Sequence, residues 1–237
     1  MKLTLKSMLI SAMAVSAVAA NAVVYTDATG DLTSPMPFGN NNLDIASLEI
    51  TNTATTISFK WTTAGTTLAG GGNDWGKYLV LIRRPGASSL DTSPTGNGWG
   101  RRVTLAGGSD RYLGGWVDGG GGVESRSFDG TNWGTLNAAS YTSGASISIS
   151  GNTYTQTVNL SNMGLAIGDT FTFDGATTGG TGSDGAWDLL SMSTPSAANT
   201  DSFVVSNSNL TYTVVPEPAT MTILGLGLAA IARRRKA

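Results

Sequence analysis

Short strand-like runs separated by glycine-rich turns recur from residue 43 to residue 215 of this chain. Lys77–Arg83, which reads KYLVLIR, is nearly continuously apolar, as a central strand with two covered faces would be. Gly151-Asn152 is a pair typical of a tight turn between antiparallel strands. No long amphipathic helix pattern occurs, and we expect one helical turn near residues 161–166. The pattern predicts an all-β fold of about ten to twelve strands, arranged as a single antiparallel β-sandwich of the jelly-roll kind.

The other predicted strands lie between turns rich in glycine, asparagine and threonine. The run at residues 43–51 alternates apolar and polar side chains, but its apolar set changes face midway. Four glycines at residues 119–122 predict a hairpin. The further runs lie at residues 55–61, 111–118, 122–128, 145–150, 153–160, 169–174, 186–192, 202–206 and 209–215.

The chain contains no cysteine and no histidine. It therefore cannot form a disulfide, and it cannot use Ser-His-Asp or Cys-His catalysis, most zinc chemistry or haem ligation through histidine. The enzyme class that remains is a two-carboxylate glycosidase. Between residues 23 and 214 the only glutamates are Glu49 and Glu124, which form no sequence cluster. We expect a protein that is not an enzyme, with the glycosidase as a remote alternative.

The charge of the body, residues 23–214, differs from that of the whole chain. The formal net charge of the chain is −2, but six of its 14 basic residues lie outside the body. The body has 8 basic and 15 acidic residues and a net charge of −7, and all its basic residues lie between Lys60 and Arg126. An acidic body disfavours nucleic acid and anionic lipid as partners, so we expect no nucleic-acid binding.

The amino terminus has the pattern of a secretory signal peptide, predicted to form a helix. Lys2 and Lys6 precede an apolar run at residues 8–18, and Ala20-Asn21-Ala22 follows as a small-x-small cleavage site. We expect signal peptidase to cut after Ala22, with residues 17–19 as a second candidate site. The alternative is an uncleaved amino-terminal anchor.

The carboxyl terminus, residues 215–237, has three parts. The prolines of Pro216-Glu217-Pro218 lack amide donors, end the preceding strand and keep the segment extended. Residues 219–232 are uncharged and largely apolar, and as a helix they would span about 21 Å. Four cations at residues 233–236 suit the cytoplasmic end of a short transmembrane helix in the inner membrane. A core helix with a charged tail is the alternative.

These three parts, in this order, resemble the PEP-CTERM sorting signal of Gram-negative bacteria that make extracellular polysaccharide. The resemblance implies processing by an exosortase, an inner-membrane-anchored precursor, and a mature protein at the cell surface or outside the cell. It implies where the protein is sorted and gives no information on its biochemical activity. The residues that carry it are Val215, Pro216, Glu217 and Pro218, together with the basic residues Arg233, Arg234, Arg235 and Lys236.

The body resembles DOMON-like and family-9-type carbohydrate-binding β-sandwiches. An opening YTDATGD at residues 25–31 leads into LDIASLEIT at residues 43–51, and the closing region at residues 168–188 is also similar. The resemblance implies a β-sandwich that binds carbohydrate. Because the chain has no histidine, it departs from the haem-binding members, and haem is not expected.

Four tryptophans lie in loop-like contexts rich in glycine, asparagine and aspartate. An indole on a loop presents a flat apolar face on which a sugar ring can stack, and nearby charged side chains can bind the hydroxyls. The alternative is that these tryptophans close the ends of the sandwich. The glycan-binding candidates are Trp75, Trp99, Trp116, Trp133, Asp118 and Arg111, with Arg101, Arg102 and Arg126 as further hydrogen-bond donors.

Carboxylates gather near both ends of the body. Carboxylate oxygens on turns suit Ca²⁺, which accepts six to eight oxygen ligands in irregular geometry. If the first and last strands are neighbours, the two sets can share one structural ion. The alternative is that these residues only form turns. The candidate ligands are Asp27, Asp31, Asp44, Asp184 and Asp188, with Asp169 and Asp174 in the same closing region.

These observations predict an exported cell-envelope protein with a signal peptide at residues 1–22, a β-sandwich at residues 23–214 and a sorting signal at residues 215–237. We expect the body to be a non-catalytic binding module for exopolysaccharide. A purely structural protein of the surface or biofilm matrix is the alternative.

Overall fold

The computed structural model describes residues 22–32, 41–67, 75–135, 144–180, 184–193, 202–207 and 210–216. About half of this part of the chain is strand and its only helices are two short 3₁₀ turns, so the prediction of a mostly β fold is confirmed. The predicted signal helix and the predicted helix at residues 219–232 lie outside the described residues. Within the described part, no helix has the length and apolar composition needed to cross a membrane.

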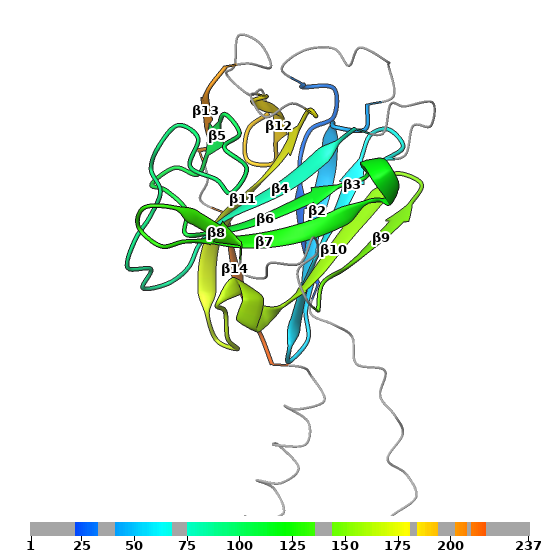
Figure 1. The fold of residues 1–237 in the computed structure, drawn as a ribbon. Helices are drawn as coiled ribbons and strands as arrows, with labels where there is room; N and C mark the ends of the chain where they lie inside the picture. The colour runs from blue at the N-terminus through cyan, green and yellow to red at the C-terminus, as the bar shows by residue number, and fades with distance from the viewer. Residues whose placement is uncertain are drawn as a thin grey trace, which may run out of the picture.

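Two antiparallel sheets form the body (Figure 1). The five-stranded sheet has the order β1-β2-β3-β10-β9. Its strands are β1 (Val23–Thr26), β2 (Ile45–Asn52), β3 (Thr56–Thr63), β10 (Thr153–Asn159) and β9 (Ser146–Ser150).

The seven-stranded sheet has the order β12-β11-β4-β6-β7-β8, and β14 also pairs with β11. Its strands are β12 (Ala186–Leu189), β11 (Thr170–Thr178), β4 (Lys77–Arg83), β6 (Arg111–Trp116), β7 (Gly122–Phe128), β8 (Trp133–Thr135) and β14 (Leu210–Thr213). One small pair departs from the predicted antiparallel arrangement, because β5 (Val103–Thr104) and β13 (Val204–Val205) run parallel.

Several turns lie where the sequence predicts them. Gly151, with φ of 58°, stands in the hairpin between β9 and β10. The glycines after β6 form the short 3₁₀ turn η1 (Asp118–Gly120) that leads into β7. The predicted helical turn is the 3₁₀ helix η2 (Leu160–Met163).

A β-bulge explains why the apolar residues of β2 change face in the sequence. The register against β3 shifts between Ile45 and Ser47, which inserts one extra residue into β2. Ile45, Leu48 and Ile50 are therefore all fully buried, although simple alternation would separate the first from the other two.

The main core lies between the two sheets. Trp61 is its largest fully buried side chain, and the ring of Tyr78 lies 5.7 Å from it across the two sheets. Strand β4 is buried on both faces, as predicted. Tyr78, Val80 and Ile82 enter the main core, whereas Leu79 and Leu81 enter a second cluster on the other face of the seven-stranded sheet. The segment between β4 and β6 covers that second cluster with residues such as Val103 and Leu105.

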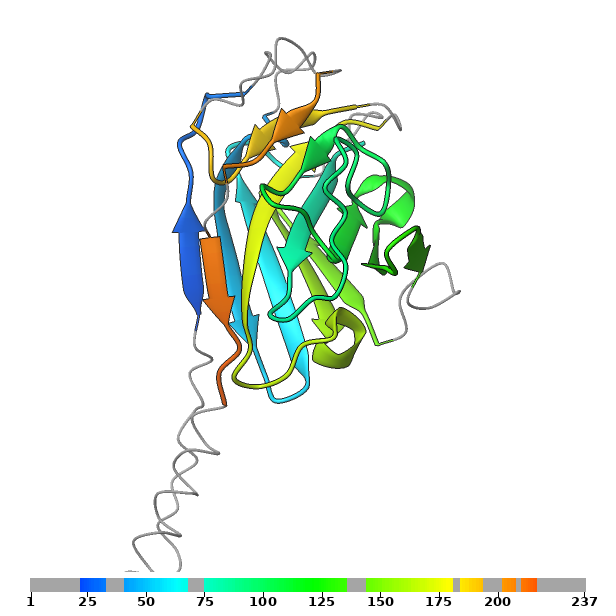
Figure 2. The ribbon, with the colours of Figure 1, turned by 90° about the vertical axis from the view of Figure 1, so that its left-hand side faces the viewer.

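The two ends of the body meet beside the end of β2, where β1 and β14 lie side by side (Figure 2). The Tyr25 hydroxyl donates to the carbonyl of Thr211 at 2.6 Å. Asn52, which is 5% exposed, anchors the residue that precedes the first proline of the tail. Its Nδ2 donates to the carbonyl of Val215 at 2.8 Å, and its Oδ1 accepts from Val215 N at 3.1 Å and from the Tyr212 hydroxyl at 2.8 Å.

Replacing Asn52 by alanine should therefore loosen the carboxyl-terminal end of the body. The Asn52→Ala change leaves the Tyr212 hydroxyl and both polar groups of Val215 without this partner, and we expect the free energy of unfolding to fall by about 2 kcal/mol. Urea denaturation measures the change. Asn152→Ala, which removes an exposed amide at a hairpin, is the control and should cost less than half as much. Equal losses in the two variants would contradict the role given to Asn52.

Candidate functional site

One buried asparagine organises the loop that crosses the outer face of the seven-stranded sheet. Asn97 is 2% exposed, and its Nδ2 donates to the carbonyls of Arg101 at 2.7 Å and Val103 at 2.8 Å. Its Oδ1 accepts from the backbone N–H groups of Trp99 at 3.1 Å and Arg101 at 3.0 Å. Gly98 fits closely here, because a Cβ at this position would lie 2.6 Å from the Tyr112 ring. The turn therefore holds Trp99 and Arg101 against the sheet.

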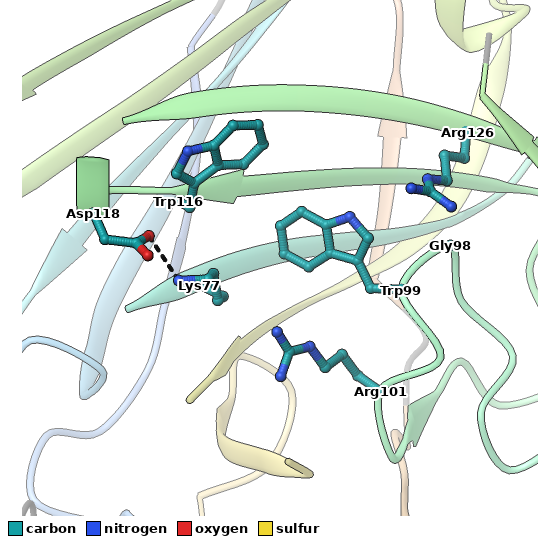
Figure 3. Close-up of a pocket in the computed structure, with 7 residues that line it drawn as sticks. All are labelled: Lys77, Gly98, Trp99, Arg101, Trp116, Asp118 and Arg126. Carbon is teal, nitrogen blue, oxygen red and sulfur yellow. Dashed lines mark hydrogen bonds and ion pairs between the residues drawn. The ribbon is translucent and has the colours of Figure 1, made fainter. Parts of the chain in front are cut away.

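The loop and the sheet line an open pocket of about 510 Å³. Strands β4, β6 and β7 supply side chains on one side, and the loop supplies those on the other (Figure 3). Gly114 leaves room for the indole of Trp99, since a Cβ at Gly114 would lie 2.6 Å from Trp99 Cζ2. The pocket is lined by Lys77, Gly98, Trp99, Arg101, Trp116, Asp118 and Arg126.

Two tryptophans give the pocket its apolar surface. The ring centroids of Trp99 and Trp116 lie 6.1 Å apart with the planes inclined at 51°. Both side chains are half-buried. Trp99 is fixed further by an edge contact with Tyr112 and by a hydrogen bond from its Nε1 to Glu124 Oε1. The two inclined rings form a corner that can receive a flat apolar ligand face.

The charged side chains around this corner are paired in two cases and unpaired in one. Lys77 Nζ lies 2.7 Å from Asp118 Oδ1, and Arg126 Nε lies 2.8 Å from Glu124 Oε1. Arg101 is 6% exposed, and its Nε and Nη1 have no hydrogen-bond partner. Its guanidinium carbon lies 5.8 Å from the centre of the Trp99 ring, and burial lowers the pKa of Arg101. The pocket therefore combines aromatic faces with a largely buried cation, two of whose nitrogens have no hydrogen-bond partner among the described residues.

The structure places the other glycan-binding candidates outside the pocket. Trp75 packs against Trp187 with a centroid distance of 6.1 Å. Trp133 lies on β8, packs against Phe128, and donates from Nε1 to Asp91 Oδ2 at 2.7 Å.

Arg111 lies at the opposite end of β6 from Trp116 and binds Asp110 at 3.3 Å. The neighbour of Arg101 in the chain, Arg102, lies over the Phe203 ring at 5.2 Å. Sequence reasoning missed Lys77 and Gly98. Lys77 enters the pocket because it pairs with Trp116 across β4 and β6, and this register is visible only in the folded sheet.

A second group of charged residues lies where the segment after β1 meets β12. One carboxylate oxygen from each of Asp27, Asp31 and Asp188 lies within 4.8 Å of the others. Asp44, which is 1% exposed, stands beside them and accepts from Gly30 N at 2.9 Å through Oδ2. Residues from the two ends of the body therefore meet in one acidic cluster.

Half of the carboxylate oxygens of these four aspartates have no hydrogen bond to a described residue. Asp27 Oδ2, both oxygens of Asp31, and Asp44 Oδ1 are buried and unpartnered. Asp188 accepts from Ile45 N at 2.6 Å and from Leu189 N at 2.8 Å. None of the salt bridges between described residues includes any of these four carboxylates.

Burial and mutual repulsion disfavour the charged forms of this cluster. Burial, with a smaller contribution from neighbouring carboxylates, raises the pKa of Asp27 to about 7 and that of Asp188 to about 8. The pKa values of Asp31 and Asp44 are also raised, chiefly by burial. A cation that accepts oxygen ligands would relieve both effects. Asp184 is not in the cluster, because its carboxylate lies beside Gly179.

The two glutamates considered for glycosidase chemistry lie on different sheets. Glu49 is on β2 and pairs with Lys60 at 3.1 Å. Glu124 is on β7, where it contacts Trp99 and Arg126. The main core separates the two sheets, so the structure does not bring these carboxylates to one site.

Comparison with known proteins gives information on one end of the chain. Residues 214–236 match the family model described as the PEP-CTERM protein-sorting motif. Neither a search of curated proteins nor a search of solved structures found a match. The chain therefore carries a PEP-CTERM sorting signal, while its body has to be interpreted from its own geometry.

Proposed function

We propose that this PEP-CTERM protein is an exosortase-sorted envelope protein whose body binds exopolysaccharide and catalyses no reaction. The sorting motif at residues 214–236 supports export and processing by exosortase. In the proposal, signal peptidase removes residues 1–22, the segment at residues 219–232 holds the precursor in the inner membrane, and the mature protein resides at the cell surface or in the matrix. The body is then a single β-sandwich of the jelly-roll, carbohydrate-binding kind.

The pocket between Trp99 and Trp116 is the observation that carries the binding proposal. Its volume of about 510 Å³ lies within the range of pockets that hold small ligands. Two inclined indoles offer apolar surface for the face of a sugar ring, and the surrounding cations and Asp118 offer hydrogen bonds to hydroxyls. Such an arrangement suits a saccharide better than a wholly apolar ligand.

Two alternatives are less well supported. A purely structural protein would be expected to bury its tryptophans, as it does Trp61, yet Trp99 and Trp116 are half-buried at a pocket. A glycosidase needs two carboxyl groups about 5 to 9.5 Å apart, whereas Glu49 and Glu124 stand on separate sheets.

Removing the indole of Trp116 should weaken binding to exopolysaccharide. Trp116 stands at the end of β6, so Trp116→Ala should leave the sheet folded and lower affinity about tenfold, or ~1.4 kcal/mol. Affinity electrophoresis in gels that contain the producing strain's exopolysaccharide measures the effect. Trp133→Ala is the matched control, because it removes a half-buried indole outside the pocket. Unchanged mobility of Trp116→Ala relative to the unmodified protein would contradict the proposal.

We also propose that Asp27, Asp31, Asp44 and Asp188 hold a structural Ca²⁺ ion. Support comes from the buried, unpartnered Oδ1 of Asp44, which stands beside the three clustered carboxylates and adds to the raised pKa of Asp27 and Asp31. Oxygen ligands without nitrogen or sulfur suit a hard cation, and carboxylates from several segments suit the flexible coordination of Ca²⁺. The ion would join the segment after β1 to β12.

Calcium should therefore raise the thermal stability of the protein. At a concentration of about 100 times its Kd, a ligand contributes about 2.7 kcal/mol, which corresponds to a rise of about 5 to 10 °C in Tm. Asp31→Asn should abolish this rise, and it should raise Tm in chelator because it removes one of the repelling charges. Asp129→Asn, at an exposed turn, is the control and should respond to calcium as the unmodified protein does. A Tm that is the same in calcium and in chelator would contradict the site.

A further inference from the structure

Arg101 is a largely buried cation in the pocket, and no carboxylate of the described residues forms an ion pair with its guanidinium. The residue is 6% exposed, and no salt bridge between described residues includes it. Its Nε and Nη1 donate no hydrogen bond. A buried donor without a partner destabilises the protein, and more strongly when it is charged. The ring of Trp99 at 5.8 Å offsets part of that cost, but it does not supply acceptors for the two N–H groups.

The other cations of the pocket already have partners. Lys77 binds Asp118 and the carbonyl of Trp75, at 2.7 Å and 2.8 Å. Arg126 binds Glu124 at 2.8 Å. The positive charge that remains is therefore concentrated at Arg101, where the attraction of Asp184 offsets part of it. Figure 3 shows its side chain extending from the loop into the pocket, toward the side where Lys77 lies.

This positive charge stands on an acidic body. Between residues 23 and 214 the chain has 8 basic and 15 acidic residues, so most of the surface repels a negatively charged polymer. An anion that binds here must therefore be held by local contacts in the pocket, because the electrostatic field of the whole body repels it. Trp99 and Trp116 meanwhile require that the ligand also present an apolar ring face.

We propose that the pocket binds an acidic saccharide, with the carboxylate of a uronic acid type of sugar on the guanidinium of Arg101 and the sugar ring against Trp99 and Trp116. The planar fork of a guanidinium matches a carboxylate and binds it through two parallel hydrogen bonds, once the side chain turns to present its buried Nε and Nη1 to the ligand. This inference depends on the proposed function, since it names the class of sugar that the same pocket takes.

Binding to a matched pair of polymers tests the inference. A polyuronate and its carboxyl-reduced form have the same linkage and differ only at C6, where the carboxylate becomes a neutral hydroxymethyl group. A sulfated polysaccharide supplies the other kind of anion. The full-length chain in detergent is titrated with each polymer by calorimetry. We expect the polyuronate to bind at least about tenfold more tightly than its reduced form, because hydrogen bonds between charged groups are stronger than those between neutral groups.

The arginine variants show whether the preference arises at Arg101. Arg101→Gln should lose most of the preference for the polyuronate and keep its affinity for the reduced polymer. Arg101→Lys retains the charge without the fork and should keep only part of the preference, and it serves if Arg101→Gln fails to fold. Arg102→Gln, a change to the adjacent arginine over Phe203, is the matched control and should keep the full preference.

The outcomes separate this inference from the proposed function. If both polymers bind equally, and Trp116→Ala weakens both while Arg101→Gln weakens neither, the pocket binds saccharide but the acidic class is wrong. A sulfated polymer that binds more tightly than the polyuronate would also overturn the carboxylate assignment. If Trp116→Ala changes binding to none of the polymers, the proposed function itself is wrong.

Discussion

Burial of β4 on both faces is the constraint on which the rest of the structure depends. Tyr78, Val80 and Ile82 pack between the two sheets, and Leu79 and Leu81 pack beneath the segment that joins β4 to β6. A sheet with one solvent-exposed face would need no segment packed over that face. Here two leucines in a central strand require one, and each buried leucine contributes about 1.5 to 3 kcal/mol. The covering segment also carries Trp99 and Arg101, which line the pocket, and Trp99 packs on Tyr112 of β6.

Much of this architecture could be predicted from the sequence, because strong local patterns determine it. The apolar run of β4, the Gly151 hairpin and the glycines after β6 all act through short-range geometry. The sequence did not predict β1, β5 and β8, which have two to four residues each. Strands this short have no clear sequence pattern and form by hydrogen bonding to a neighbouring strand. The sequence of β2 showed that its apolar residues change face. Only the register with β3 shows that a β-bulge causes this change.

The residues of the candidate sites could likewise be predicted only in part, because strand register decides which of them meet. Tryptophan in a glycine-rich context pointed to Trp99 and Trp116, which meet in the pocket, and equally to Trp75 and Trp133, which do not. No local signal separates these two pairs, because strand register and the turn at Asn97 decide which indoles meet. The sequence analysis expected the first and last segments of the body to be neighbours, and Asp27, Asp31 and Asp188 from these segments lie together. The exception is Asp184, which lies only four residues before Asp188 but outside the acidic cluster.

The central claim is that the corner between Trp99 and Trp116 is a saccharide site completed by Arg101, and a crystal structure of the protein with a short uronic acid oligosaccharide tests it most directly. The account predicts a sugar ring against the two indoles and a carboxylate about 3 Å from the Arg101 guanidinium. A saccharide bound elsewhere on the body, with this pocket untouched and the Arg101 guanidinium paired with a protein carboxylate, would contradict it.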